Sequence, residues 1–240
     1  MHIAGWQKVS LVDYPGKVAC TLFTGGCNLR CPYCHNSELL EGPLPAQDIQ
    51  EVLAYLDARK GILDGVVVSG GEPCLQPDLA AFLARLKEKD LLVKLDTNGC
   101  YPDLLGEILN RHLVDYVAMD WKNAPEDYAL TVGREASPLE QVTGSLDKLL
   151  SGSVPFELRT TVVEQLHTER SFEKIRDYLE PLLAKKGKKI PAFYLQAFKD
   201  RDTVPFAGFT APDKKSLERY AALLEPLADK VGLRGVQHNI

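Results

Sequence analysis

Three cysteines within an eight-residue stretch constrain this chain more than any other feature. Cys27, Cys31 and Cys34 follow the spacing Cys-x3-Cys-x2-Cys and come just after an apolar run. Three thiols this close in sequence cannot all pair with one another as disulfides, but they can all face one inorganic group. A cubane iron–sulfur cluster has four irons, so three cysteine ligands leave one iron open. An open coordination position distinguishes a catalytic metal site from a structural one, as it does for zinc.

Two other uses of the three cysteines must be weighed against a cluster. A disulfide framework is typical of small secreted chains, whereas this chain has 240 residues. A zinc site needs a fourth ligand, and His35, which directly follows Cys34, is the candidate. Zinc motifs usually contain two pairs of ligands rather than one tight triplet. The spacing therefore favours an iron–sulfur cluster.

Composition and charge exclude several classes of protein. The chain is 45% hydrophobic and 25% charged, which suits one globular domain that needs no disulfides for stability. The net charge is −5 and no basic patch is visible, so we expect no nucleic-acid partner. Residues 1–10 lack the apolar centre of a signal peptide, and no apolar run approaches the ~20 residues of a membrane span. We therefore expect a cytoplasmic protein without membrane contact, in which six cysteines indicate metal or redox chemistry.

Apolar runs and helical periodicities alternate along the chain. Six β-prone runs predict strands, and each is followed by apolar residues at helical spacing. We expect Gly61 to close the first helix, Ser137 and Pro138 to open a capping box, and Ser171 to cap the fifth helix. The strands are expected at 18–23, 66–69, 91–95, 114–119, 156–163 and 193–198, with helices that begin near Ile49, Leu79, Leu104, Leu139, Phe172 and Pro212.

Six strands that alternate with helices require a parallel sheet with right-handed crossovers. Periodicity alone does not distinguish an open doubly wound sheet from an incomplete barrel, because a closed TIM barrel has eight such units. We expect a single domain over residues 1–240. Within it, residues 1–16 form a lead-in, 17–198 the barrel core, and 199–240 a C-terminal helix and tail.

Polar clusters stand at the carboxyl ends of four successive strands. The cysteine loop is followed by Gly70-Gly71-Glu72-Pro73, then by Asp96-Thr97-Asn98-Gly99, then by Asp120-Trp121-Lys122. The Glu and Asp residues of these clusters could instead have a purely structural role, because both residue types stabilise or cap helix N-termini. A parallel α/β fold, however, gathers the carboxyl ends of its strands on one face. Four clusters in register therefore predict one extended site.

These motifs resemble a known family along nearly the whole chain. The cysteine triplet and Gly70-Gly71-Glu72 are similar to the signatures of the radical S-adenosylmethionine (SAM) superfamily. The segments 96–99, 120–122, 34–36 and 12–16 resemble motifs of its glycyl-radical-enzyme activases. Tyr14 stands where that group has Gly, and this departure, with the short length, points to the branch of anaerobic ribonucleoside-triphosphate reductase activating proteins. The resemblance implies an α/β fold, a partial (β/α)6 TIM-like barrel.

The resemblance also implies the cofactors and the reaction. Cys27, Cys31 and Cys34 would hold one [4Fe-4S] cluster, and the open iron would be chelated by the amino and carboxylate groups of SAM. An electron from the cluster, supplied by a flavodoxin- or ferredoxin-type donor, would cleave SAM to methionine and a 5′-deoxyadenosyl radical. That radical would take a hydrogen atom from a glycine of a partner protein, a glycyl radical enzyme. The resemblance points to anaerobic ribonucleotide reductase as that partner.

Roles for individual residues follow from the same resemblance. The backbone of Gly70 and Gly71, together with Glu72, would hold the SAM amino group. Lys122 and Arg159 would pair with the SAM carboxylate or with the substrate backbone, unless Arg159 points outward into solvent.

Further residues are implied at the margins of this site. Tyr33 would pack on the adenine or else cover the cluster from water. A Na⁺ or K⁺ ion would bind beside the SAM carboxylate, since oxygen donors suit a hard cation. The donors of that ion would be Asp96, Thr97, Asp120 and the carbonyl of Ala118. Other candidates for contact with SAM or substrate are Asp13, His35, Asn98 and Gln196.

The remaining cysteines and two rival functions complete the expectations. Cys20, Cys74 and Cys100 are expected to be unligated thiols, so the chain would hold a single cluster. One rival is a small-molecule radical SAM enzyme of the 7-carboxy-7-deazaguanine synthase type, against which segment 13–16 and the Asp120-x-Lys122 pair argue. The other is an iron–sulfur scaffold or electron carrier, which has no need of Gly70-Gly71-Glu72 or of carboxylates at strand ends.

Overall fold

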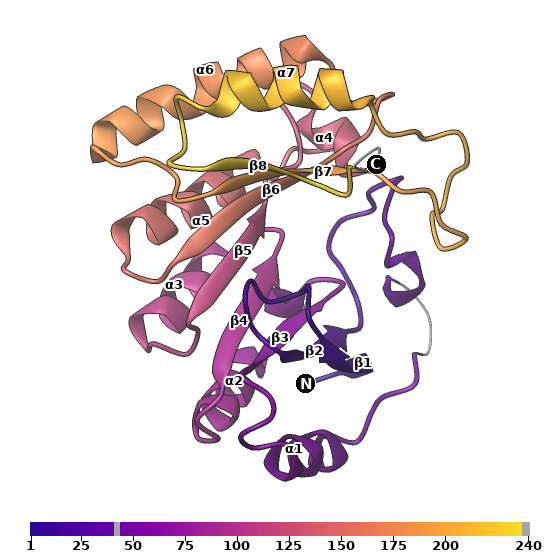
Figure 1. The fold of residues 1–240 in the computed structure, drawn as a ribbon, viewed down its shortest axis with the longest axis vertical. Helices are drawn as coiled ribbons and strands as arrows, with labels where there is room; N and C mark the ends of the chain where they lie inside the picture. Colours follow the sequence, from indigo (N-terminus) through magenta and orange to yellow (C-terminus); the bar gives the residue numbers. More distant parts are fainter. Residues whose placement is uncertain (41–43, 237–240) are drawn as a thin grey trace.

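One eight-stranded sheet organises the computed structural model, which describes residues 1–40 and 44–236 (Figure 1). The strands lie in the sheet in their sequence order. Strand β1 is antiparallel to β2, and every later strand is parallel to its predecessor. The strands are β1 (Ile3–Ser10), β2 (Ala19–Thr24), β3 (Gly65–Gly70), β4 (Leu92–Thr97), β5 (Tyr116–Asp120), β6 (Phe156–Val162), β7 (Phe193–Ala197) and β8 (Val231–Arg234).

The helices form the connections between parallel strands and lie outside the curved sheet (Figure 1). Because β1 and β8 are the two edges, the sheet forms an incomplete barrel that is open between them. The α-helices are α1 (Ile49–Ala58), α2 (Leu79–Lys87), α3 (Pro102–Asn110), α4 (Tyr128–Thr131), α5 (Leu139–Ser151), α6 (Glu169–Lys186) and α7 (Lys214–Leu224), and the short 3₁₀ helices are η1 (Ser37–Leu39) and η2 (Pro73–Leu75).

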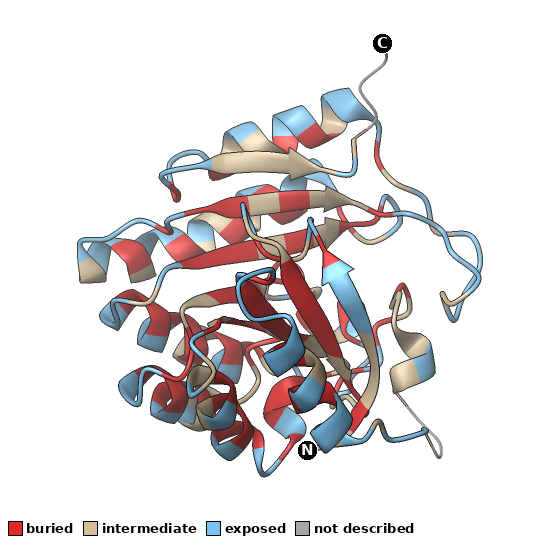
Figure 2. Cartoon of the chain, turned by 60° about the horizontal axis from the view of Figure 1, so that its bottom comes forward, coloured by how far each residue is buried: buried red, intermediate tan, exposed pale blue. Residues whose placement is uncertain are grey.

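The core lies between the strands and the inner faces of these helices (Figure 2). Val66, Val67 and Val68 of β3 are all fully buried, as expected for a parallel strand that is covered on both faces. Each helix buries one side only; α6, for example, buries Phe172 and Ile175 and exposes its charged side. This packing holds the carboxyl ends of the strands at one end of the sheet, where the site is built.

All six predicted strands and their helices are present, so the expected α/β fold with six βα units is confirmed. Two strands were not predicted. Residues 1–16 are not merely a lead-in, because β1 pairs with β2, and the expected tail contains β8. Strand β1 lacks a continuous buried run, and β8 has four residues that are all only half-buried, so neither gives a strong apolar signal. Residues 237–240 of the expected tail lie outside the described residues.

Three predicted helix boundaries are wrong. Helix α1 ends at Ala58, and Gly61 lies in the turn beyond it with φ +81°. Helix α5 begins after Pro138, and the Ser137 hydroxyl accepts from the Leu139 N–H over 3.3 Å, but the Glu140 side chain does not return a bond, so the predicted capping box is only half formed. Helix α6 begins three residues earlier than predicted: Thr168 is its N-cap, and Ser171 completes the capping box from inside the helix.

None of the helices in the described part of the chain is long and apolar enough to cross a membrane.

Candidate functional site

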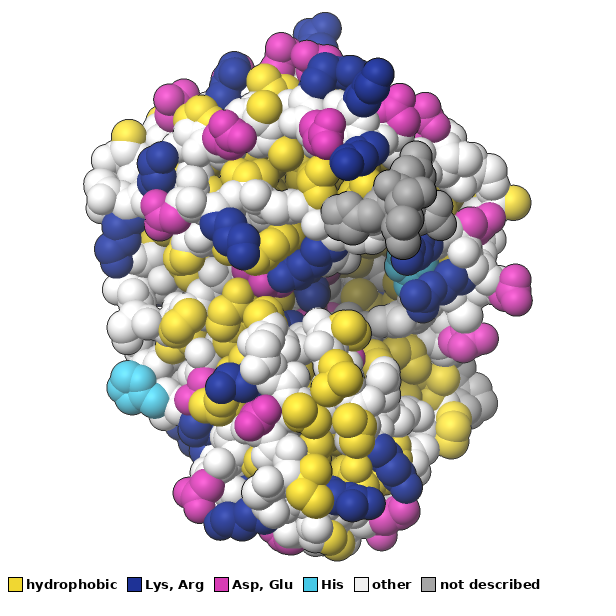
Figure 3. Space-filling model, in the orientation of Figure 1, with side chains coloured by type: hydrophobic (Ala, Val, Ile, Leu, Met, Phe, Trp, Pro, Cys, Tyr) yellow, Lys and Arg dark blue, Asp and Glu magenta, His cyan; other side chains and the backbone are white. Residues whose placement is uncertain are grey.

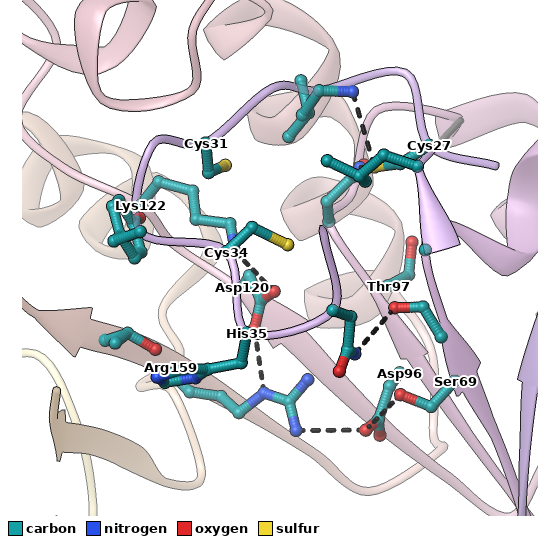
Figure 4. A pocket seen from close by; sticks show the side chains of 18 of the residues that line it. Cys27, Cys31, Cys34, His35, Ser69, Asp96, Thr97, Asp120, Lys122 and Arg159 are labelled. Carbon is teal, nitrogen blue, oxygen red and sulfur yellow. Dashed lines mark hydrogen bonds and ion pairs between the residues drawn. The ribbon is translucent and has the colours of Figure 1, made fainter. Parts of the chain in front are cut away.

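The carboxyl ends of the parallel strands surround a cavity of about 350 Å³, here called the central cavity (Figure 4). All four predicted polar clusters contribute to its wall, so the structure brings the expected site together. Glu72, Ala118 and the three additional cysteines, by contrast, do not line it. The predicted residues that do are Asp13, Cys27, Cys31, Tyr33, Cys34, His35, Gly70, Gly71, Asp96, Thr97, Asn98, Asp120, Lys122, Arg159 and Gln196.

The three cysteine thiols line one side of the central cavity and form no disulfide (Figure 4). Burial raises the pKa of Cys31 to about 12, and it also raises the pKa values of Cys27 and Cys34. Neutral buried thiols are stable without a ligand, whereas a metal would bind them as thiolates. No three Cys, His, Asp or Glu side chains of the described residues come together closely enough to hold a single metal ion.

Among the described residues, His35 and these cysteines do not form a group that could hold a single metal ion. Its Nε2 atom lies 2.6 Å from the carbonyl oxygen of Lys199, and its ring stacks on Phe198 with centroids 5.3 Å apart. The histidine therefore joins the cysteine loop to the segment after β7, and the zinc alternative finds no support.

The Gly-Gly turn after β3 lies directly against the start of the cysteine loop. The Gly71 N–H donates to the Thr24 carbonyl over 2.9 Å, and the Glu72 N–H donates to the Gly26 carbonyl over 2.9 Å. Gly70 has φ +119°, a conformation that favours glycine. A Cβ at Gly70 or Gly71 would lie within 3.0 Å of backbone atoms of β2 or the loop. Glycine is therefore required here for close backbone approach.

The Glu72 side chain does not point into the central cavity, contrary to its predicted contact with the SAM amino group. The residue is 0% exposed, and its carboxylate accepts three hydrogen bonds within the protein. The donors are the Cys74 N–H (2.9 Å), the Thr97 hydroxyl (2.7 Å) and the Asn98 N–H (2.7 Å). Glu72 thus caps η2 and holds the end of β4. In the sequence, stabilisation of a helix N-terminus was the alternative to ligand binding.

Beside the cysteines, the charged side chains of Asp96, Arg159, Asp120 and Lys122 follow one another with alternating sign (Figure 4). Arg159 of β6 donates through Nε to Asp120 (2.9 Å) and through Nη1 to Asp96 (3.1 Å), so it points inward. Lys122 Nζ lies 2.7 Å from the other oxygen of Asp120, and Lys94 pairs with Asp96. Asp96 and Asp120 therefore form ion pairs with Lys and Arg side chains of the protein, and they do not cap helices.

These ion pairs control the protonation of the carboxylates. Burial alone would raise the pKa of Asp120, but Lys122 and Arg159 beside it lower the pKa to about 2. Arg159 and Lys94 likewise lower the pKa of Asp96 against the effect of burial. Asp120 in turn raises the pKa of Lys122 well above its ordinary value, although burial acts in the opposite direction. Asp96, Asp120 and Lys122 are therefore charged at neutral pH.

Lys94 is a site residue that the sequence reasoning missed. Its side chain is buried inside the barrel and pairs with Asp96 of the same strand. Residues two apart on a strand share a face, so the Lys94-x-Asp96 spacing within β4 was the available signal.

A hydrogen-bonded segment, residues 121–133, links Lys122 to the cysteine loop. The Lys122 N–H donates to the Tyr128 hydroxyl over 3.4 Å, and the Lys122 carbonyl lies 2.8 Å from Nε2 of His167. At the other end of the segment, the Val132 carbonyl accepts from the Arg30 N–H over 2.9 Å. One segment therefore positions both Lys122 and the loop between Cys27 and Cys31.

His167 was also missed, since it belongs to no motif. It is 1% exposed, and burial lowers its pKa, so the ring is neutral. The Val163 N–H donates to Nδ1 over 3.1 Å, which leaves the proton on Nε2 to be donated to the Lys122 carbonyl. The ring thus fixes the backbone that carries Lys122.

The weaker candidates take varied positions. Asp13 accepts from the Thr21 hydroxyl over 2.7 Å at the cavity wall. Tyr33 is buried against the cavity, and its hydroxyl has no hydrogen-bond partner among the described residues. Asn98 donates to the Asn28 side chain over 2.8 Å and so holds the cysteine loop. Cys20 and Cys74 are buried and Cys100 is half-buried, all with free thiols.

Comparisons with known proteins agree with this geometry. Residues 21–179 match the radical SAM superfamily model. A Methanocaldococcus jannaschii protein that is assigned by name to the glycyl-radical enzyme activating enzymes is 31% identical over 242 residues, which span 98% of this chain and 96% of the relative. The pyruvate formate-lyase-activating enzyme of Staphylococcus aureus is 37% identical over 142 residues, 52% of this chain and 55% of that enzyme.

A solved structure supports the fold. The crystal structure of a domain of pyruvate-formate lyase-activating enzyme from Bacteroides vulgatus has a TM-score of 0.57 at 18% identity, with 71% of this chain and 99% of that chain covered. The family match and the relative that aligns over nearly its full length show that the chain belongs to the radical SAM superfamily, in the group of glycyl-radical enzyme activating enzymes.

Proposed function

We propose that this protein activates a glycyl radical enzyme by removing a hydrogen atom from the Cα of one glycine in a partner protein. The observation that carries the proposal is the convergence on one cavity of three free thiols and the charged chain Asp96–Arg159–Asp120–Lys122. An electron carrier would need only the thiols. Activating enzymes act on a protein substrate, and we propose a partner polypeptide segment as the substrate here.

The residues present fit the group's cofactors, a [4Fe-4S] cluster and SAM. Cys27, Cys31 and Cys34 would hold the cluster, because their thiols form no disulfide and line one cavity. When bound, the cluster and SAM would supply hydrogen-atom abstraction, with one electron from a flavodoxin- or ferredoxin-type donor and with methionine and 5′-deoxyadenosine as the products.

The chain's own residues would bind, orient and shield the reactants. The Gly70–Gly71 backbone lines the cavity and offers close approach to the SAM amino group, while Lys122 and Arg159 offer positive charge to the SAM carboxylate. Tyr33, which is buried against the cavity, excludes water and has an unpaired hydroxyl to offer to a ligand. Gln196, from β7, would contact SAM or substrate from the far wall.

Two finer points are part of the proposal. Anaerobic ribonucleotide reductase is the proposed partner, on the grounds of Tyr14 and the chain length. A Na⁺ or K⁺ ion on Asp96, Thr97, Asp120 and the Ala118 carbonyl would have to displace Arg159 or Lys94 from the carboxylates. Replacing K⁺ by tetramethylammonium should then weaken SAM binding; equal affinity in both salts would count against the ion.

The free thiols suit a reducing compartment such as the cytoplasm.

Reductive cleavage of SAM tests the proposal at its base. The protein is reconstituted anaerobically with iron and sulfide, and 5′-deoxyadenosine is measured after addition of SAM and dithionite. We expect the nucleoside from wild type and from Cys20→Ala, whose fully buried thiol lies outside the cavity, but none from Cys31→Ala. A protein that holds its cluster and cleaves no SAM would refute the proposal. Consumption of a small molecule without any glycyl radical signal on a partner would favour the 7-carboxy-7-deazaguanine synthase type.

A further inference from the structure

Asp96 of β4 divides its two carboxylate oxygens between two cations of the protein. Its Oδ1 atom accepts from the Lys94 ammonium, and its Oδ2 atom accepts from Nη1 of Arg159 over 3.1 Å. Asp120 of β5 is divided in the same way, with Oδ1 on Nε of Arg159 and Oδ2 on the Lys122 ammonium. In each carboxylate, a lysine therefore occupies the oxygen that Arg159 leaves free.

The two carboxylates fix the guanidinium of Arg159 between them (Figure 4). Its remaining nitrogen, Nη2, forms no hydrogen bond within the part of the chain that the structure describes, and the residue lines the central cavity. Basic and acidic side chains are both visible in the hollow on this face of the molecule (Figure 3). The N–H groups that the carboxylates leave unused are thus the ones that an anionic ligand can meet.

Lys94 supports this arrangement from outside the central cavity. Its side chain is 2% exposed, and it does not line that cavity. Without the ammonium, Oδ1 of Asp96 would be a buried charged oxygen that lacks a donor, which is costly. Arginine and carboxylate groups favour a fork in which two N–H donors meet both oxygens. The guanidinium of Arg159 would therefore turn fully onto Asp96 and leave Asp120.

We propose that Lys94 is a positioning residue for the SAM carboxylate: by occupying one oxygen of Asp96, it keeps Arg159 in place for that carboxylate. The inference rests on the proposed function, in which Arg159 offers its positive charge to the same group. Lys94 itself makes no contact with SAM in this account. The alternative is a direct effect of the lysine charge on the ligand, which would act with or without Arg159.

The preference for SAM over decarboxylated SAM measures how well the site meets the carboxylate. Both ligands are titrated into the reconstituted protein in a tetramethylammonium buffer, so that no K⁺ or Na⁺ competes for Asp96. We expect wild type to prefer SAM by at least about ten-fold, because hydrogen bonds between charged groups are strong. Lys94→Met should lose about three- to ten-fold of this preference and keep its affinity for decarboxylated SAM. An equal loss for both ligands would reveal a general structural role and overturn the proposal.

A milder variant keeps the test decisive if Lys94→Met does not fold. The amide of Lys94→Gln still donates to Oδ1 of Asp96 but carries no charge, so we expect it to lose about two- to three-fold of the preference. A folded Lys94→Gln protein with the full preference of wild type would then overturn the proposal.

Lys87→Met is the matched control. Lys87 pairs with Asp115 over 2.7 Å, and Asp115 accepts from the Val93 N–H of β4, so this variant also removes a lysine–aspartate pair that is anchored on β4. Neither Lys87 nor Asp115 lines the central cavity. The control should keep the full preference for SAM, and a loss as large as that of Lys94→Met would overturn the proposal.

The Arg159→Gln background decides between positioning and a direct effect of the charge. There, Lys94→Met should change the preference by less than about two-fold, because the group that Lys94 positions has been removed. The same loss in both backgrounds would show that the lysine charge acts on the ligand without Arg159, and the proposal would be wrong.

A crystal structure of Lys94→Met reads the geometry without any cofactor. We expect both oxygens of Asp96 on Arg159 and no bond between Nε and Asp120; unchanged contacts of Arg159 would overturn the proposal. SAM cleavage by wild type tests the proposed function separately. Cleavage by wild type together with a full preference in Lys94→Met would refute only the role of Lys94, whereas a wild type that holds its cluster and cleaves no SAM would refute the proposed function.

Discussion

Gly71 and Gly26 bring the end of β3 into backbone contact with the start of the cysteine loop. The Glu72 N–H donates to the Gly26 carbonyl, and a Cβ placed on Gly71 would lie less than 3.0 Å from that same oxygen. Backbone atoms on both sides leave no flexible side chain that could move aside. The Gly-Gly-Glu motif therefore seats the cysteine loop in addition to lining the cavity.

Substitution of Gly71 by alanine should weaken both folding and cluster retention. We expect Gly71→Ala to lower the free energy of unfolding by about 1–3 kcal/mol, as overpacking does, and to reduce the iron bound after reconstitution. Gly5→Ala in β1 is the matched control, because a Cβ there meets nothing within 4 Å. Denaturant unfolding and iron analysis measure the two effects. Full iron content in Gly71→Ala would show that the loop tolerates displacement.

The sequence predicted which residues at strand ends would lie at the central cavity. Asp96 and Asp120 were placed correctly because parallel strands carry their carboxyl ends to one face, whatever the details of packing. Hydrogen bonds between residues far apart in the sequence were harder to predict. The Glu72 carboxylate binds Thr97 and Asn98, about 25 positions away, and only the three-dimensional pairing of β3 with β4 brings them together.

The edges of the fold escaped prediction for a related reason. Strand β1 exposes Gln7, Lys8 and Val9 near its end, so alternation is weak, and its place depends on pairing with β2. His167 carries no local signal, because its role arises only when the loop after β6 packs against the end of β5.

Asp120 should make stability depend on pH in the acid range. Its pKa is lowered from 3.8 to about 2 in the folded state, so its contribution is fully present above pH 4 and is lost as the pH falls through 2. The shift corresponds to about 2 kcal/mol. We expect Asp120→Asn to be less stable than wild type by about that amount at pH 7.

Unfolding by denaturant at several pH values checks this prediction by difference. Because other carboxyl groups titrate in both proteins, the informative quantity is the gap between wild type and Asp120→Asn. That gap should close between pH 4 and pH 2. A gap that stays constant across this range would mean that Lys122 and Arg159 do not stabilise the charged form of Asp120.

His167 should act on SAM binding through Lys122. His167→Leu leaves the Lys122 carbonyl without its donor, and we expect the dissociation constant for SAM to rise on the order of ten-fold, the equivalent of one lost hydrogen bond. His167→Gln keeps an amide donor and should restore part of the affinity. Val52→Ala, in the core of remote helix α1, should lower stability without changing SAM affinity. If SAM affinity in His167→Leu equals that of wild type, the histidine serves folding alone.

Transfer of deuterium from glycine tests the central claim most directly. Glycyl radical enzymes, anaerobic ribonucleotide reductase first, are produced with glycine deuterated at Cα and incubated anaerobically with the reconstituted protein, SAM and a reductant. Mass spectrometry then gives the deuterium content of the 5′-deoxyadenosine formed. Our account predicts one deuterium in the product and a glycyl radical signal on the partner. Unlabelled 5′-deoxyadenosine with every partner, from protein that cleaves SAM, would contradict it.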